Sequence, residues 1–557
     1  MTKIMKALSL ILACVMLVSL ICACAPNVNT DTTAKESETI NVQTETNAPQ
    51  TETETTAAQT EETTTEAVTT EPETTAPVYV EKVSKLGDYT VRYTDDSFDE
   101  DNITLQFGAL SDIHQNGSAN SQYYKKYVSA LKQLKNISGG NLDAVAFAGD
   151  LTDGATRAQW QQVISGYLEV LDPEETYFMY CMGNHDSNHQ YTSNFEYFQN
   201  LLEHSGKNFF AALQEDTPED MYKIANYHYN VNGYDFFSVT VEYFSVGANC
   251  QISANTISWL DEQLKAVTEA KPNQPVFIII HCMIYNTVYG STLDTSTGST
   301  SLGWYTSQLT RTLKKYPQVV TFSGHLHFPL NDERSIMQTD FTSLGCGSVR
   351  YMAIENGGYE DMKSATVMND CEEFSQGLFV QVDANGAMRI VRMDFYHNET
   401  IRTAWVIPAT RPDGSHLTKY TKDRDDKTAP EFSGDAEIIL RKVTASAVQT
   451  TLKYKSAADA DIVHHYQIYV FDSKGKTVQS YKIISDFYRH ATVEDMNEYW
   501  TKELRGLNFD TEYTIEVYAY DSWDNQSTPL RIVVTTSENE PNYQYLVYVG
   551  DVEIKQD

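Results

Sequence analysis

The chain has 557 residues, 41% of them hydrophobic, and its formal net charge is −35. This length predicts two or three folded units, and a surface so acidic excludes nucleic-acid duplexes and anionic lipid as bulk partners. Eight cysteines are present, but three lie in the first 24 residues and the other five form no CxxC pair, which excludes a disulfide scaffold and a zinc-thiolate site.

The N-terminus has the pattern of a secretory signal. Lys3 and Lys6 precede an apolar run over residues 7–20 that is short for a membrane span. The Ile-Cys-Ala-Cys sequence that ends at Cys24 resembles a bacterial lipobox, in which cleavage leaves a lipid-modified cysteine first. We therefore expect residues 1–24 to be a lipoprotein signal peptide, with Cys24 as the lipidation site. The protein would then be extracytoplasmic and anchored to the cell membrane by its lipid.

Residues 25–78 are rich in Thr and Glu and poor in apolar side chains. Such a segment cannot bury enough surface to offset the entropy of ordering, so we expect a disordered linker. It would hold the folded part of the chain away from the membrane.

The next part of the chain, residues 79–410, has an alternating α/β pattern. Apolar runs that predict strands occupy residues 105–110, 142–148, 177–182, 236–241, 276–280 and 319–322. Helical patterns lie between some of them, as at residues 121–134 and 156–171. Short buried strands separated by helices indicate sheets covered by helices, which is the α/β class.

Polar motifs follow these predicted strands. Their metal-ligating candidates are Asp112, His114, Asp150, Asn184, His281, His325 and His327. Because the carboxyl ends of strands meet at one edge of an α/β sheet, we expect these side chains to converge.

The donor atoms of this set are oxygen and nitrogen only, which suits zinc, manganese or iron. Seven donors exceed the needs of one ion, whereas a carboxylate that bridges two ions would use them all. Two ions about 3.5–4 Å apart can clamp the attacking and leaving oxygens of an in-line displacement.

Taken together, the motifs D-x-H, G-D-x-x-D-G, G-N-H-D, a single His and G-H-x-H resemble those of the calcineurin-like metallophosphoesterases. The resemblance implies a four-layer fold, in which two packed β-sheets are flanked by helices, for a catalytic domain over residues 79–410. It also implies two metal sites: Asp112, His114 and His327 in one, Asn184, His281 and His325 in the other, and Asp150 as the bridge.

The same resemblance implies that His185 is the general acid for the leaving group, or a stabiliser of its charge, and that Asp186 orients His185. One motif position differs between this chain and a related group of phosphatases. Purple acid phosphatases have a tyrosine three residues after the bridging Asp, whereas this chain has Asp153. An iron-tyrosinate centre is therefore not expected.

Residues 428–536 alternate apolar and polar side chains between turn signals, and the spacing of Leu507 and Tyr513 resembles the tyrosine corner of a fibronectin type III domain. We expect a small all-β sandwich there, followed by a C-terminal tail over residues 537–557.

The resemblance predicts an enzyme that hydrolyses a phosphodiester or phosphomonoester by metal-activated hydroxide, with two divalent or trivalent ions (manganese, iron or zinc) as cofactors. The signal-like N-terminus predicts that this enzyme is exported. The motif set is similar to that of class III cyclic nucleotide phosphodiesterases, which favours a diester. The alternative is a non-catalytic surface protein or adhesin on a phosphoesterase scaffold, whose sandwich would contact the cell wall or glycans. Every ligand position of the signature is filled, which favours the enzyme.

Overall fold

The computed structural model describes residues 81–95, 97–187, 193–244, 250–291, 307–355, 365–442, 448–537 and 545–555. The predicted signal peptide with Cys24 and the predicted linker lie outside these residues, so both stay predictions. Within the described part of the chain, no helix has both the length and the apolar character needed to cross a bilayer.

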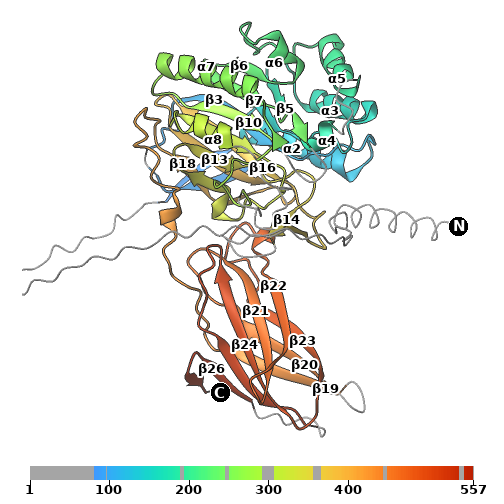
Figure 1. The fold of residues 1–557 in the computed structure, drawn as a ribbon, viewed down its shortest axis with the longest axis vertical. Helices are drawn as coiled ribbons and strands as arrows, with labels where there is room; N and C mark the ends of the chain where they lie inside the picture. Colours follow the sequence, from blue (N-terminus) through green and yellow to red (C-terminus); the bar gives the residue numbers. More distant parts are fainter. Residues whose placement is uncertain are drawn as a thin grey trace, which may run out of the picture. The chain divides into compact units, whose positions relative to one another are not determined.

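Two six-stranded sheets form the centre of the α/β part (Figure 1). The first sheet has the order β18-β17-β16-β3-β4-β5 and contains β3 (Ile103–Leu110), β4 (Ala144–Ala148), β5 (Tyr177–Cys181), β16 (Gln376–Asp383), β17 (Met388–Asp394) and β18 (Glu399–Ile407). The second sheet has the order β12-β13-β11-β10-β7-β6 and contains β6 (Tyr227–Val231), β7 (Tyr234–Val239), β10 (Val276–Ile280), β11 (Val319–Ser323), β12 (Ile336–Gln338) and β13 (Thr342–Gly345).

Parallel strands occupy the middle of both sheets. Strands β3, β4 and β5 run parallel in the first sheet, and β7, β10, β11 and β13 run parallel in the second. The remaining strands of these sheets pair antiparallel at the edges. The carboxyl ends of seven parallel strands are thereby available for a shared site.

The strand period decides which layer each apolar side chain joins. On β10, Phe277 and Ile279 belong to the core between the sheets, whereas Ile278 and Ile280 belong to the core beneath the helices of the second sheet. Phe107 of β3 crosses to the second sheet, with its ring centroid 5.1 Å from that of Phe277. Alternation along one strand therefore binds the two sheets together and also binds a sheet to its helices.

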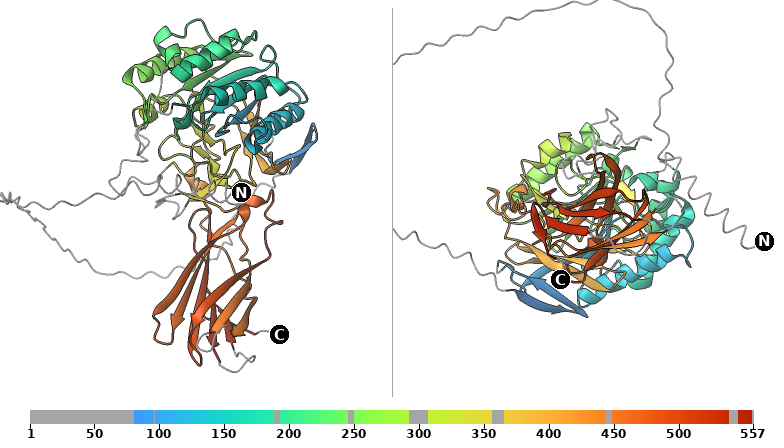
Figure 2. Two further views of the ribbon diagram at one scale, coloured as in Figure 1. Left: turned by 90° about the vertical axis from the view of Figure 1, so that its right-hand side faces the viewer. Right: turned by 90° about the horizontal axis from the view of Figure 1, so that it is seen from below.

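Helices cover the outer faces of this sheet pair (Figure 2). Helices α2 (Gln122–Ile137) and α3 (Arg157–Val170) pack on the first sheet, and α7 (Ala254–Ala270) and α8 (Ser307–Leu313) pack on the second. Helix α3 begins at a capping box, in which Thr156 and Gln159 each accept a hydrogen bond from the backbone N–H of the other. The predicted four-layer α/β architecture is confirmed.

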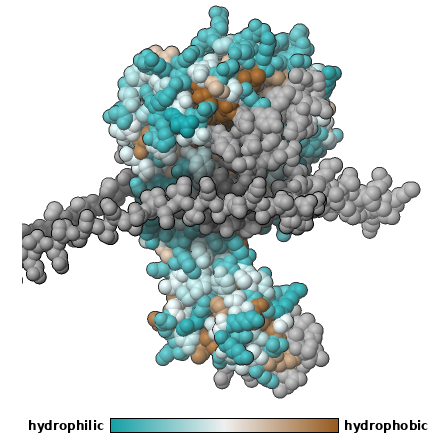
Figure 3. All heavy atoms as spheres, viewed as in Figure 1, coloured by the Kyte–Doolittle hydropathy of each residue, from teal (hydrophilic) through white to brown (hydrophobic). Residues whose placement is uncertain are grey.

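The smaller elements are α4 (Asn184–Ser187), α5 (Ser193–His204), α6 (Glu219–Lys223), β1 (Lys82–Leu86), β2 (Tyr89–Tyr93), β8 (Tyr243–Phe244), β9 (Cys250–Gln251), β14 (Ala353–Glu355) and β15 (Ala365–Val367). On the face drawn in Figure 3, hydrophilic residues predominate among those that are coloured.

The C-terminal part is a β-sandwich. One sheet contains β19 (Ala436–Lys442), β20 (Val448–Lys455) and β23 (Tyr499–Leu507). The other contains β21 (Val463–Asp472), β22 (Thr477–Ile484), β24 (Glu512–Asp521), β25 (Leu530–Thr535), β26 (Tyr545–Val549) and β27 (Val552–Ile554). The hydroxyl of Tyr513 accepts a hydrogen bond of 3.0 Å from the backbone N–H of Asn508, as a tyrosine corner does.

The predicted tail over residues 537–557 is wrong as a description of this segment. Its strands β26 and β27 extend the sandwich sheet, because β26 pairs antiparallel with β25 and buries Val547 opposite Ile532.

Candidate metal centre

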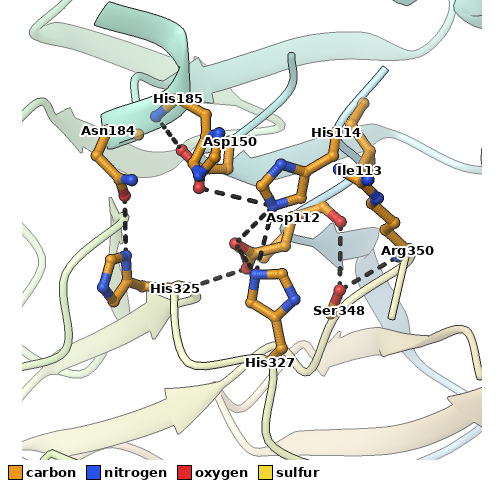
Figure 4. Close-up of polar contacts among 12 residues, drawn as sticks. Asp112, Ile113, His114, Asp150, Asn184, His185, His325, His327, Ser348 and Arg350 are labelled. Atoms are coloured by element: carbon orange, nitrogen blue, oxygen red, sulfur yellow. Dashed lines mark hydrogen bonds and ion pairs between the residues drawn. The ribbon is translucent and has the colours of Figure 1, made fainter. Parts of the chain in front are cut away.

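The structure brings all seven predicted ligands together at the carboxyl ends of the parallel strands. Strands β3 and β4 end before Asp112 and Asp150, and Asn184 follows β5. Strand β10 ends before His281, and β11 ends before the loop with His325 and His327. Figure 4 shows Asp112, His114 and His327 on one side, Asn184 and His325 on the other, and Asp150 between them.

The backbone at these positions is strained. Five ligands have left-handed φ angles: Asp112 (53°), His114 (41°), Asp150 (50°), His325 (76°) and His327 (59°). Residues other than glycine rarely adopt left-handed φ angles, and such strain concentrates at functional sites. The surrounding loops hold these conformations; for example, the N–H of His114 donates to the carbonyl of Asp150 at 3.0 Å.

Two glycines allow the motif loops to approach one another. A Cβ on Gly183 would collide with the Asp150 carboxylate, and a Cβ on Gly324 would collide with Ser111 and with the Asp112 carboxylate. These glycines of the G-N-H-D and G-H-x-H motifs are therefore needed for close packing around the ligands.

The first donor group consists of Asp112, His114 and His327. The Nε2 of His327 lies 3.0 Å from Oδ1 of Asp112 and 3.3 Å from Nε2 of His114. The Oδ1 atom is buried yet takes part in no hydrogen bond. A buried carboxylate oxygen that faces two imidazole nitrogens without bonding to them fits a metal ligand, because an ion would satisfy it.

The second donor group consists of Asn184, His281 and His325. The Oδ1 of Asn184 lies 2.9 Å from Nδ1 of His325 and 3.1 Å from Nε2 of His281. Asp150 joins the two groups, since its Oδ2 is 3.7 Å from Nε2 of His114 and 3.4 Å from Nε2 of His281. One carboxylate oxygen therefore faces both groups.

Backbone carbonyls orient two of the histidines. The Nδ1 of His281 donates to the carbonyl of Ala148 at 2.8 Å, and the Nδ1 of His327 donates to the carbonyl of Tyr351 at 3.1 Å. These hydrogen bonds leave each Nε2 lone pair directed at the donor group, as metal ligation requires.

The electrostatics of the centre favour ionised carboxylates. Burial acts to raise the pKa of Asp150, but the neighbouring His281 and His185 outweigh it and lower that pKa. Conversely, burial acts to lower the pKa of His281, but Asp150 raises it to about 10. In His325, burial and the neighbouring His281 lower the pKa to about 3. Both carboxylate ligands stay anionic at neutral pH, because the pKa of Asp112 is lowered as well.

His185 lies beside the first donor group. Its ring centroid is 4.6 Å from that of His114, in an edge-on arrangement. Its Nδ1 donates to the backbone carbonyl of Asp153 at 3.0 Å, so its Nε2 is the nitrogen available for a substrate.

The role predicted for Asp186 needs correction. Its carboxylate accepts hydrogen bonds from the backbone N–H groups of Gly183, Leu151 and Thr152 and from the Thr152 hydroxyl, at 2.8–3.1 Å. Asp186 therefore fastens the loop of Asp150 to the loop of His185, while the imidazole itself is oriented by the Asp153 carbonyl.

The sequence reasoning missed the loop after β13. Its Ser348 hydroxyl donates to the carbonyl of Asp112 at 3.3 Å, as does the N–H of Arg350 at 3.2 Å. The Arg350 guanidinium pairs with the Asp153 carboxylate, and the ring of Tyr351 lies 4.2 Å from that of His327. The available signal was weak: a short Thr-Ser-Leu-Gly strand followed by a Gly-Ser turn.

Residues 105–329 match the family model of the calcineurin-like phosphoesterases. No curated protein matches the sequence.

Several solved structures align with the chain, and three of them are as follows. The purple acid phosphatase PPD1 from yellow lupin (Lupinus luteus) seeds aligns at 12% identity and a TM-score of 0.40, over 59% of this chain and 57% of that one, so the chain spans little more than half of its length. A fibronectin type III domain of human collagen XX aligns at 24% identity and a TM-score of 0.14, over 20% of this chain and 93% of that one. The chitinase ChiA74 from Bacillus thuringiensis aligns at 11% identity and a TM-score of 0.15, over 70% and 71%. At these TM-scores the alignments carry no further conclusion.

Proposed function

Because residues 105–329 form a calcineurin-like phosphoesterase domain, a metal-dependent phosphoester hydrolase, we propose that this protein cleaves a phosphodiester or phosphomonoester at a centre of two metal ions. The observation that carries the proposal is the place of Asp150, whose Oδ2 faces a histidine of each donor group at 3.4–3.7 Å.

Each donor group would hold one ion. Asp112, His114 and His327 would bind the first, Asn184, His281 and His325 the second, and Asp150 both. When bound, such a pair supplies Lewis acidity and lowers the pKa of a water between the ions. The oxygen and nitrogen donors fit manganese, iron or zinc.

His185 would act on the leaving group. Because its Nδ1–H is engaged by the Asp153 carbonyl, the proton for the leaving oxygen comes from Nε2 of the imidazolium form. The edge-on packing against His114 fixes the ring next to the first donor group. Asp186 supports this geometry through the backbone of the two loops that it joins.

The place of action is proposed from the sequence. The signal-like N-terminus and the Cys24 motif support export and attachment to the membrane by a lipid. The sandwich is proposed to contact the cell wall or glycans, in line with the exported location.

The test uses residues 25–557, purified without chelator. We expect two metal ions per chain, and hydrolysis of a chromogenic phosphodiester or monoester that Asp150→Asn abolishes. The ratio of the two rates identifies the substrate class. A chain that binds no metal and shows no rate above the variant, even after manganese or zinc is supplied, would instead be the surface-binding protein.

A further inference from the structure

We infer that Asp153, held in place by Arg350, is the positioning carboxylate of His114 and sets the affinity of the first donor group for its ion. This inference rests on the proposed two-ion function, which assigns His114 as a ligand. Asp153 and Arg350 are not among the seven proposed ligands.

The two nitrogens of His114 face opposite ways. Its Nε2 faces Asp112, Asp150 and His327, each at 3.3–3.7 Å. Its Nδ1 faces Oδ1 of Asp153 at 3.6 Å. Since the ring separates these positions, a carboxylate at Nδ1 cannot share an ion bound at Nε2. Asp153 therefore contacts His114 on the side of the ring that faces away from the proposed ion.

The group at Nδ1 distinguishes His114 from His281 and His327, because it is a carboxylate and not a backbone carbonyl. The Nδ1 of His281 and that of His327 donate to backbone carbonyls at 2.8 and 3.1 Å. The Nδ1 of His114 is buried, takes part in no hydrogen bond, and faces a carboxylate oxygen at 3.6 Å. A carboxylate draws the Nδ1 proton more strongly than a carbonyl does, which makes Nε2 a stronger metal ligand.

Arg350 holds the carboxylate in this position. Its guanidinium pairs with Oδ1 of Asp153 and stacks over the ring of Tyr123 at 4.2 Å. Its backbone is fixed as well, because its N–H donates to the carbonyl of Asp112 at 3.2 Å and its carbonyl accepts from the buried Lys126. A side chain fixed at both ends can hold Asp153 against the ring of His114.

The loop of Arg350 also reaches the other histidine of this donor group. The carbonyl of Tyr351, the next residue, accepts the Nδ1–H of His327 at 3.1 Å. Two successive residues of the loop after β13 therefore set the orientation of both histidines that share the first ion with Asp112.

The experiment compares metal binding by the chain and its variants after removal of metal and reloading with cobalt. Equilibrium dialysis gives the affinity for each ion, and the visible absorption of cobalt reports the ligand field. Asp153→Asn removes the charge at constant shape, and Arg350→Gln releases the carboxylate. Glu100→Gln is the matched control, because Glu100 pairs with the buried Arg389 at 3.2 Å, and Arg389 stacks on Tyr93 at 4.9 Å, away from the centre.

We expect Asp153→Asn to weaken one of the two binding steps about tenfold or more and to change the cobalt spectrum. Arg350→Gln should act in the same direction by a smaller factor, and Glu100→Gln should change neither quantity. Should Asp153→Asn fail to fold, Arg350→Gln alone decides, because unchanged affinities in that variant overturn the inference.

Asp112→Asn separates this inference from the proposed function. If Asp112→Asn loses an ion while Asp153→Asn binds both with the affinities and spectrum of the unmodified chain, the positioning role is wrong and the two-ion centre stands. If Asp112→Asn also binds both ions normally, the proposed centre itself is wrong, and the inference fails with it.

Discussion

The Nε2 of His327 lies 3.0 Å from Oδ1 of Asp112, although Asp112 follows β3 of the first sheet and His327 follows β11 of the second. An ion between these atoms would link the two sheets. Metal binding should therefore contribute to the stability of the fold as well as to its chemistry.

Removal of metal should lower the melting temperature of the catalytic part. A ligand present at about 100 times its Kd stabilises the folded state by about 2.7 kcal/mol, so a chelator should lower the transition by several degrees. Differential scanning calorimetry with chelator, and then with zinc or manganese in excess, measures the change. An identical transition under both conditions would contradict a metal link between the sheets.

Asp150→Asn should remove most of the activity while the fold stays intact. The substitution removes the carboxylate whose Oδ2 faces a histidine of each donor group. The loss of about 4 kcal/mol of transition-state stabilisation corresponds to about a thousandfold lower rate. Circular dichroism serves as the folding control, and near-normal turnover would refute the bridging role.

His185→Ala should keep both ions and lose rate by a factor of about 10²–10⁴. If His185 protonates the leaving oxygen, the loss should be larger for an alkyl ester than for a nitrophenyl ester, whose leaving group needs little help. Metal content and the two rates are the measurements. A variant that loses its metal, or that is slowed equally with both esters, would rule out the general-acid role.

Loading of the metal-free protein should release protons at pH 7.5. Burial acts to lower the pKa of His114, but the carboxylates of Asp112 and Asp153 raise it to about 9, and the pKa of His281 is raised to about 10. Both imidazoles are then protonated at this pH without metal and must lose the proton to bind an ion. Protonation of these two histidines stabilises the metal-free fold. This stabilisation is complete below their ordinary pKa of 6.5 and is lost as the pH rises through 9–10.

Titration calorimetry in buffers of different ionisation enthalpy counts these protons. Metal affinity should rise with pH between about 6.5 and 10, because fewer protons then have to leave. Metal uptake without proton release would show that the histidines are neutral beforehand.

Arg334→Met should destabilise the fold by about 3–5 kcal/mol, because it leaves the carboxylate of Asp332 buried without its charge partner. The two side chains pair at 2.7 Å and are almost fully buried. Lys223→Ala is the control, since its pair with Glu219 at 2.6 Å is exposed and should matter little. Equal shifts of the urea midpoint in both variants would contradict the claim that the buried pair matters more to stability than the exposed pair.

Much of this architecture could be predicted because each ligand stands at the end of an apolar strand. The seven donors of the proposed centre follow directly from that order. The neighbours of the ligands are harder to predict, because they depend on pairing between distant strands. Arg350 reaches Asp153 only because β13 pairs parallel with β11, and β13 has too few apolar residues to be recognised as a buried strand.

The direction in which a side chain points is a second feature that is hard to predict from the sequence. The sequence places Asp186 beside His185, but the carboxylate turns to the backbone, because two buried N–H groups of the Asp150 loop and the N–H of Gly183 need an acceptor. The left-handed φ angles of the ligands likewise cannot be predicted from the sequence, because Asp and His residues adopt them only when the surrounding loops enforce them.

The most direct test of the two-ion centre is a titration of the metal-free chain with manganese, in which phosphodiester and phosphomonoester hydrolysis is followed against the number of ions added per chain. We expect activity to rise until two ions are bound and then to stay constant, with most of the activity absent from Asp150→Asn at every ratio. Full activity with a single bound ion, or equal rates in the chain and the variant, would contradict a centre in which Asp150 serves two ions.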